Sequence, residues 1–143
     1  MAKRFFSLCL CLIIFLCLPL GASANDVQTA NAKVSLISEV ETVKAGEGFW
    51  VAFRFQLREG WHIYWQNPGD SGTKTTLKWQ LPMGFSAGEI QFPYPKRFSI
   101  PPLANFGYEK EVYLPVQVRS PAKLVSDTVN LRVKADWLIC EKE

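Results

Sequence analysis

The clearest pattern along the chain is an alternation of apolar and polar residues with a period of two. In residues 49–57 every odd position is apolar, while the even positions include Arg54 and Gln56. Residues 128–139 repeat this pattern, again with every odd position apolar. Because successive side chains of a strand point to opposite faces of a sheet, both segments are predicted to be strands with one buried face.

Shorter segments of the same kind lie between these two. The further strand candidates are residues 33–39, 61–66, 75–80, 88–92 and 111–118, and turn signals rich in Gly and Pro lie at 45–48, 67–70, 81–84 and 120–121. Pro68-Gly69 suits the central positions of a type II turn, and Pro115 predicts an edge strand or a bulge. About seven short strands and no helical periodicity predict an all-β, immunoglobulin-like β-sandwich.

The N-terminal segment differs from the rest of the chain. A basic start at Lys3 and Arg4, an uncharged apolar run over residues 8–18 and small residues before a cleavage site are typical of a secretory signal peptide. The apolar run is shorter than the ~20 residues that span a bilayer. We therefore expect a cleaved signal peptide over residues 1–24, followed by a single exported domain over residues 25–143.

Removal of the signal peptide changes both the charge and the cysteine count. Of the 16 basic and 13 acidic residues, 14 basic and all 13 acidic ones remain, so the net charge gives no reason to expect a nucleic-acid partner. Three of the 4 cysteines lie in the signal peptide, and only Cys140 remains. Because exported proteins usually pair their cysteines, Cys140 is either an inert core residue, an intermolecular linker, or half of a pair whose partner is missing.

Several familiar patterns of catalysis and binding are incomplete. Gly69-Asp70-Ser71-Gly72 is similar to the nucleophile segment of chymotrypsin-like serine proteases, but the domain is too small for their double barrel, and we interpret the segment as a polar turn. One histidine, His62, and one cysteine cannot complete a zinc or copper shell. The sequence contains no glycine motif that binds phosphate or a dinucleotide. Lys96-Arg97 is interpreted as part of a solvated loop. The sequence thus predicts no cofactor, no metal and no nucleic-acid partner.

Aromatic residues are abundant, with 5 Trp and 4 Tyr. Trp137 lies on the apolar face of its strand and is predicted to be in the core. In residues 61–66 the odd positions form one apolar face suited to the core, while His62 and Tyr64 point the other way. Rings on a β-sandwich can also hold sugars or peptides. One hypothesis is therefore a non-redox secreted binding module that uses an aromatic face, with Cys140 structural.

Cys140 is the remaining candidate for chemistry. It lies where the last predicted strand ends, on the same side as Asp136 and Leu138, and a thiol at a strand end is reachable. The neighbouring acids, which are Asp136, Glu141 and Glu143, disfavour the thiolate. This suits a sulfur that is attacked by a partner's thiolate better than a strongly activated nucleophile. A structural role explains Cys140 equally well, since it could be a small apolar side chain that closes the sandwich.

Three segments, in this order, carry a resemblance to a known family. They are GWHIYWQNPGDSG at 60–72, NFGYE at 105–109 with VYLPV at 112–116, and DWLIC at 136–140. Through them nearly all of the chain from about residue 32 resembles the N-terminal periplasmic domain of the bacterial thiol:disulfide interchange reductases. The resemblance is to the DsbD-like family, and particularly to its ScsB-like branch.

The resemblance implies a fold, a function and site residues. It implies an immunoglobulin-like domain in the periplasm that receives reducing equivalents from a membrane-embedded domain by way of a thioredoxin-like domain. The domain passes them to periplasmic substrate proteins, such as a disulfide isomerase, a cytochrome c maturation factor or proteins of copper stress defence. Cys140 matches the first cysteine of a redox pair. Phe106 matches a cap-loop aromatic residue that covers the disulfide, and Tyr108 is a second candidate for this shielding.

The sequence departs from the family after Cys140. The family's second cysteine follows within a few residues, whereas this chain stops at Glu143, and the membrane and C-terminal thioredoxin-like domains are absent. We therefore expect a fragment or a truncated reading frame. By itself it is expected to form only a mixed disulfide through Cys140 or a disulfide-linked dimer, and not to act alone as a protein-disulfide reductase.

Overall fold

The computed structural model describes residues 26–141, without the side chains of residues 99 and 100. The predicted signal peptide lies outside the described residues. Within them the regular structure consists of β-strands. No described segment forms a helix with the length and apolar character needed to cross a bilayer.

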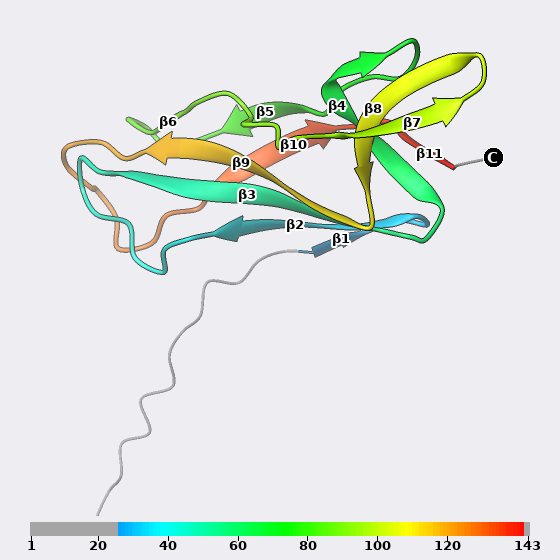
Figure 1. Cartoon of the computed structure of the whole chain (residues 1–143). Helices are drawn as coiled ribbons and strands as arrows, with labels where there is room; N and C mark the ends of the chain where they lie inside the picture. The colour runs from blue at the N-terminus through cyan, green and yellow to red at the C-terminus, as the bar shows by residue number, and fades with distance from the viewer. Residues whose placement is uncertain (1–25, 142–143) are drawn as a thin grey trace, which may run out of the picture.

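Over residues 26–141 the chain forms eleven strands in three sheets (Figure 1). In chain order the strands are β1 (Asp26–Gln28), β2 (Ala32–Ser38), β3 (Gly48–Leu57), β4 (Trp61–Gly69), β5 (Thr76–Gln80), β6 (Ser86–Ala87), β7 (Lys96–Ile100), β8 (Leu103–Glu109), β9 (Glu111–Arg119), β10 (Arg132–Asp136) and β11 (Ile139–Glu141). Each strand pairs with its neighbours in the antiparallel sense.

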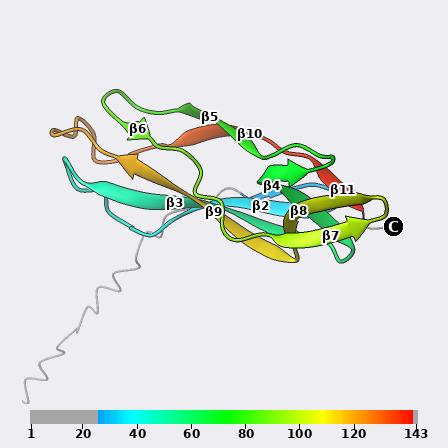
Figure 2. The same cartoon turned by 45° about the horizontal axis from the view of Figure 1, so that its top comes forward.

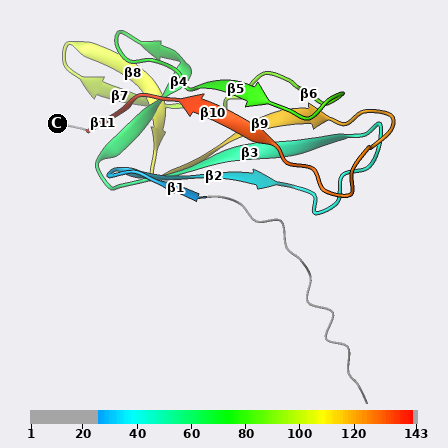
Figure 3. The same cartoon turned by 180° about the vertical axis from the view of Figure 1, so that it is seen from behind.

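The three sheets are arranged as a sandwich with an extension at one end. The five-stranded sheet has the order β1-β2-β3-β9-β6, the two-stranded sheet is β10-β5, and the four-stranded sheet has the order β11-β4-β8-β7. Figures 1 and 3 show the β10-β5 pair lying over β3 and β9. Figure 2 shows the four-stranded sheet gathered at the end where the C-terminus lies. This arrangement confirms the prediction of an all-β, immunoglobulin-like fold.

The core lies between the five-stranded sheet and the β10-β5 pair. The odd residues of β3, from Phe49 to Leu57, are buried, as their alternation predicts. The Phe55 ring meets the Trp137 ring edge-on at 5.4 Å between centroids, and the Phe53 ring meets Trp79 in the same way at 6.5 Å. The prediction that Trp137 belongs to the core is therefore confirmed. Each such side chain stabilises the fold by about 2 kcal/mol through removal of apolar surface from water.

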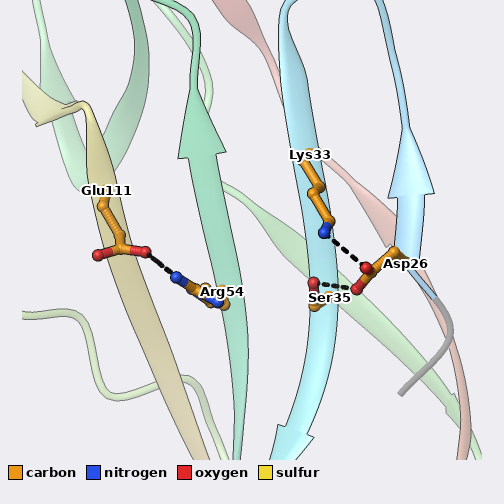
Figure 4. Close-up of polar contacts among 5 residues, drawn as sticks. All are labelled: Asp26, Lys33, Ser35, Arg54 and Glu111. Carbon is orange, nitrogen blue, oxygen red and sulfur yellow. Dashed lines mark hydrogen bonds and ion pairs between the residues drawn. The ribbon is translucent and has the colours of Figure 1, made fainter. Parts of the chain in front are cut away.

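The opposite face of the five-stranded sheet is polar near β1 (Figure 4). Lys33 Nζ lies 2.7 Å from Asp26 Oδ2, and Arg54 Nη2 lies 2.7 Å from Glu111 Oε1. Hydrogen bonds from Lys33 and Ser35 hold the pKa of Asp26 below its ordinary value. These charged pairs are exposed, so they mark the solvent side of β2, β3 and β9 and contribute little to stability.

The structure corrects the predicted strands at several positions, and it places Pro68-Gly69, predicted as the centre of a turn, within β4. The single strand predicted over 128–139 is divided into β10 and β11, because β10 pairs with β5 and β11 pairs with β4 in another sheet. The strand predicted over 88–92 is wrong, since β6 ends at Ala87. Lys96 and Arg97, interpreted as a solvated loop, instead begin β7, which forms a hairpin with β8.

Pro115 lies in β9 beyond the end of the short strand β6. β6 pairs only with Val118 and Arg119, so the side of β9 away from β3 has no strand neighbour at Pro115. The Pro115 carbonyl there accepts a hydrogen bond of 2.8 Å from the backbone N–H of Gln91. Because N–H and C=O of one strand residue point to the same side, the missing proline N–H removes no bond to β3. β9 lies between β3 and β6, so it is not the predicted edge strand, but at Pro115 its outer side has no strand neighbour, and this accommodates the proline.

Candidate functional site

Cys140 is the middle residue of β11, at the edge of the four-stranded sheet. It is half-buried and is the free cysteine of the described residues. In the antiparallel register it lies directly opposite His62 of β4. Because side chains of directly opposed residues lie on the same face of a sheet, Cys140 and His62 share a face, which we call the thiol face.

The other face of the same sheet packs against the apolar core. Ile63 is opposite both Ile139 of β11 and Tyr108 of β8, and all three contribute to the core cluster. This agrees with the core face predicted for residues 61–66. However, His62 is 0% exposed and Tyr64 only 4% exposed, so the thiol face is buried as well. This second buried layer was not predicted, because its members are largely polar and show no apolar pattern.

The thiol face is covered by the Phe98 ring of β7 and by the loop that follows β4. The His62 ring lies 4.9 Å from the Phe98 ring and 5.1 Å from the Tyr64 ring, measured between centroids. Gly72 lies against the Tyr64 ring so closely that a Cβ there would clash with it. Its φ of 95° also favours glycine. The loop therefore packs directly against the Tyr64 ring.

The Tyr64 side chain connects this buried layer to the thiol. Its hydroxyl lies within the electrostatic reach of the Cys140 and Ser71 side chains. Burial and, after it, the contact with Cys140 raise the pKa of Tyr64 to about 12, while the hydrogen bond from Ser71 acts in the opposite direction. The tyrosine is therefore neutral near pH 7 and has a proton to donate to the sulfur.

Ser71 is held in place by Asn105 of β8. The Ser71 backbone N–H donates to Asn105 Oδ1 at 2.9 Å, and Asn105 Nδ2 donates to Ser71 Oγ at 2.9 Å. Asn105 is 1% exposed, so water does not compete for these bonds. The segment interpreted as a polar turn is thus an ordered loop bound across β8, and it packs against the Tyr64 ring.

The remaining residues predicted for the site make contacts elsewhere. The Phe106 ring meets the Trp65 ring at 6.3 Å between centroids. Tyr108 is buried, and its hydroxyl donates to the carbonyl of Pro93 at 2.7 Å. Asp136 is exposed at the end of β10, opposite Thr76. The shielding role of Phe106 and Tyr108 and the electrostatic role of Asp136 stay predictions.

Two grooves occur away from Cys140. One, of about 420 Å³, lies on the outer side of β2, β3 and β9 and is lined by Ile37, Trp50 and Pro115 among others. The other, of about 350 Å³, lies beside the exposed rings of Tyr94 and Tyr113. Within residues 26–141 no cluster of three or more His, Cys, Asp or Glu side chains is arranged to hold a metal ion.

The fold and the family of the sequence together define a thiol:disulfide interchange domain. Residues 32–143 match the family described as "Thiol:disulfide interchange protein DsbD, N-terminal". The match extends over more than half of the chain, and the chain belongs to this family. No curated protein sequence matches it.

A solved structure has the same fold. The crystal structure of the N-terminal periplasmic domain of ScsB from Proteus mirabilis superposes with a TM-score of 0.63 at 23% sequence identity. The alignment covers 81% of this chain and 44% of that chain, so the present chain spans less than half the length of the ScsB structure. At this identity the likeness establishes the fold alone.

The sequence did not predict that His62, Tyr64, Ser71 and Asn105 gather in the part of the structure that carries Cys140. A signal for them was nevertheless present in the three segments that carry the family resemblance. Residues 60–72 supply His62, Tyr64 and Ser71, residues 105–109 supply Asn105, and residues 136–140 supply the thiol. The structure brings these three segments together at one place in the four-stranded sheet.

Proposed function

We propose that the domain transfers reducing equivalents to periplasmic substrate proteins by thiol–disulfide exchange, with Cys140 as one member of a redox pair. The observation that carries the proposal is the meeting of the three family segments around a half-buried, free thiol. The hydroxyl of Tyr64 reaches this thiol from a buried layer of polar residues. The described location of the ScsB domain supports the periplasm as the compartment.

The proposed reaction is an exchange of sulfur–sulfur bonds. A thiolate of the domain attacks a substrate disulfide, whose S–S bond breaks; a mixed disulfide forms, and one substrate thiolate leaves. The second cysteine of the pair, which the family places shortly after the first, attacks the mixed disulfide and releases the reduced substrate. The domain dithiol is then oxidised by two electrons, and the substrate disulfide is reduced to two thiols.

The residues around Cys140 suit the mixed-disulfide step. β11 has β4 on one side only, so Cys140 lies in an edge strand that a partner can approach. Tyr64 lies on the same face of the sheet as Cys140, and its neutral hydroxyl can donate a hydrogen bond to a partner that reaches the thiol. The partners proposed for the domain are the thioredoxin-like and membrane-embedded domains that re-reduce it, and the periplasmic proteins that it reduces.

Trapping of the mixed disulfide tests this function. The reduced mature chain, residues 25–143, in which Cys140 is the one cysteine, is mixed with a thioredoxin-like domain that retains one active-site cysteine, activated as its thionitrobenzoate disulfide. We expect a covalent one-to-one complex with the wild-type chain, detected by mass, and none with Cys140→Ser. If the wild-type chain yields no complex, the proposed function is wrong.

The cap-loop prediction has its own test in a protein that carries both cysteines. Phe106→Ala removes the ring that is proposed to shield the pair, so non-specific oxidation by a small disulfide should become several-fold faster. Arg97→Ala, which alters an exposed residue paired with Phe106 across the β7–β8 hairpin, is the matched control. Equal oxidation rates of Phe106→Ala and wild type would show that Phe106 does not shield the cysteine pair.

The alternative is a non-redox binding module. It is favoured by the apolar groove beside Trp50, whose ring is 37% exposed on the outer side of β3. In that case Trp50→Ala abolishes binding of a hydrophobic ligand or peptide, and Cys140→Ser changes nothing. The trapping experiment separates the two functions, because a merely structural Cys140 forms no specific complex.

A further inference from the structure

We propose that the outer face of the β10–β5 pair is a docking surface for an acidic thiol-exchange partner, which exposes carboxylates near its reacting cysteine. The inference rests on the proposed function of Cys140 as an exchanging thiol, and it adds the kind of charge that the partner carries. The surface, which we call the basic face, consists of the exposed even-numbered residues of the two strands. They are Thr76, Lys78, Gln80, Arg132, Lys134 and Asp136.

The strand register brings like charges together on the basic face. Lys78 of β5 lies directly opposite Lys134 of β10, and Arg132 lies opposite the neutral Gln80. Side chains that oppose each other in this way have Cβ atoms about 5 Å apart, and two like charges at this separation destabilise the strand pairing. An acid at either position would have stabilised it. The sheet therefore keeps a pair of cations that the fold alone does not explain.

The outer face of the five-stranded sheet treats its bases differently. There Lys33 pairs with Asp26, and Arg54 pairs with Glu111. Over residues 26–141 no base of the basic face forms an ion pair. Asp136, the acid of this face, lies opposite Thr76 at the other end of the pair from Arg132 and Gln80. The positive charge of the basic face is thus available to a partner.

The basic face continues to the thiol along one side of the chain. Every odd residue from 133 to 139 packs against the core cluster, namely Val133, Ala135, Trp137 and Ile139. Because side chains of an extended segment alternate between its two sides, the even residues from 132 to 140 lie on the side away from the core. Leu138, which is 40% exposed, therefore lies between the basic face and Cys140. Figure 3 shows β10 leading into β11.

Lys74 adds a positive charge beside the strand that faces Cys140. It is exposed, and its backbone forms a parallel bridge with that of Tyr64 in β4. Tyr64 is two residues from His62, which lies opposite Cys140. Within the part of the chain that the structure describes, Lys74 also forms no ion pair. Lys74 thus extends the positive charge of the basic face toward the thiol.

The dimensions of this region suit a protein partner. A strand rises about 3.3 Å per residue, so Lys134 lies at most about 20 Å from Cys140. A standard protein interface covers about 800 Å² of each partner and is about 30 Å across, so one partner can contact both residues. An anionic membrane would also be attracted by the bases, but its binding would not depend on a position beside Cys140. The continuity with the thiol therefore favours a thiol-exchange partner.

Charge complementarity at the rim of an interface acts mainly on the rate at which two partners meet. An acidic partner should therefore react with Cys140 faster than a neutral one, and salt should remove the difference. The chemistry of the exchange itself is unchanged. The Cys140 thiolate attacks the partner's disulfide, its S–S bond breaks, and one thiolate leaves.

Two activated peptides test the inference on the mature chain, in which Cys140 is the one cysteine. Each peptide carries a cysteine as its thionitrobenzoate disulfide, then a Gly-Ser spacer of about twelve residues, which spans about 20 Å. The spacer ends in four Glu residues in one peptide and in four Gln residues in the other. Release of thionitrobenzoate gives the rates. The Glu peptide should react about 5-fold faster at low salt, and no faster at about 1 M salt, where charges are screened.

Two double variants locate the effect. Lys78→Gln/Lys134→Gln should abolish the preference for the Glu peptide and leave the rate with the Gln peptide unchanged. The matched control, Lys44→Gln/Lys123→Gln, removes the same charge from exposed residues outside the basic face and should keep the 5-fold preference. An equal loss of preference in both double variants, or no loss in Lys78→Gln/Lys134→Gln, overturns the inference.

Reversal of the charge makes the test independent of stability. Lys78→Glu/Lys134→Glu should react faster with a third peptide that ends in four Lys residues than with the Glu peptide. If this variant still prefers the Glu peptide, the basic face does not select the partner. Urea denaturation checks the premise, because removal of the opposed charges in Lys78→Gln/Lys134→Gln should not lower the free energy of unfolding. A lower value would contradict the repulsion between the two lysines.

Sedimentation with vesicles of phosphatidylethanolamine and phosphatidylglycerol examines the other occupant. If wild type binds these vesicles through Lys78 and Lys134 and shows no preference for the Glu peptide, the basic face binds a membrane and the inference is wrong. Equal rates of wild type with the Glu and Gln peptides refute the docking surface alone. A wild-type chain that forms no mixed disulfide with the activated thioredoxin-like domain refutes the proposed function.

Discussion

β3 and β4 are consecutive strands that use their two faces differently. In β3 the buried residues alternate with residues that face water, and the exposed side includes the Arg54–Glu111 ion pair. In β4 the three consecutive residues His62, Ile63 and Tyr64 are all buried. β3, with one face exposed to water, builds the sandwich. β4 is covered on both faces, so it can keep polar side chains away from water on the face that carries the thiol.

The largest effect is expected on the core side of β3. Phe55→Ala removes a ring that is fully buried against Trp137 and Phe53, so it should lower the free energy of unfolding by about 4 kcal/mol. Gln56→Ala, on the opposite face of the same strand, should change it by less than about 0.5 kcal/mol. Urea denaturation measures both, and similar losses would show that the two faces of β3 are not distinct.

A smaller effect is expected where β4 and β8 approach each other. A Cβ on Gly107 would collide with the backbone carbonyl of Ile63, and backbone cannot give way as a side chain can. Gly107→Ala should therefore cost about 3 kcal/mol.

The control for this substitution is Gly48→Ala in β3. There a Cβ would meet the end of the Gln117 side chain at 3.4 Å, which can move, so the change should be nearly neutral. If Gly107→Ala lowers the free energy of unfolding no more than Gly48→Ala does, β4 and β8 do not pair as closely as described. The position of the thiol face on β4 would then be wrong as well.

The smallest effect concerns pH and the tyrosines outside the main core. The pKa of Tyr64 is raised to about 12 in the folded chain, above its ordinary value of 10.0. The neutral tyrosine contributes to the free energy of unfolding. This contribution is fully present below about pH 10 and is lost as the pH rises through about 12. Wild type should consequently lose more stability over this interval than Tyr64→Phe does.

Tyr113→Phe is the control for the alkaline measurement, because Tyr113 is 40% exposed on the outer side of the five-stranded sheet. It should lose stability with pH as wild type does. Unfolding by urea at a series of alkaline pH values provides the data. Parallel curves for wild type and Tyr64→Phe would mean that Tyr64 is not held neutral by burial and by the thiol.

The three central strands of the five-stranded sheet, β2, β3 and β9, were the most predictable part of the fold, whereas β1 and β6 of the same sheet were not predicted. The bounds predicted for β2, β3 and β9 differ from the observed ones by a residue or so, because each strand has one apolar and one wet face. The β7–β8 hairpin was missed. Its residues face the core on one side and the polar layer of His62 and Asn105 on the other, so no simple alternation of apolar and polar positions marks it.

The candidate site was predictable only in part, because it depends on contacts between distant segments. Cys140 could be singled out from its position and from the family resemblance. Ser71 and Asn105, in contrast, are separated by 34 residues, and their pairing depends on the register of β4 with β8. A loop rich in Gly, Asp and Ser looks the same in sequence whether it is solvated or bound across a strand. Its position beside Tyr64 therefore required the structure.

The rate of mixed-disulfide formation tests the central claim most directly. The activated thioredoxin-like domain is mixed with the folded chain or with an unstructured peptide of residues 135–141, which presents the same cysteine without the fold. Release of thionitrobenzoate gives both rates. The folded chain is expected to react at least about 10-fold faster than the peptide, because the fold holds the thiol in an edge strand where the partner can dock. A folded chain that reacts no faster than the peptide would contradict the claim that this domain is built for thiol–disulfide exchange.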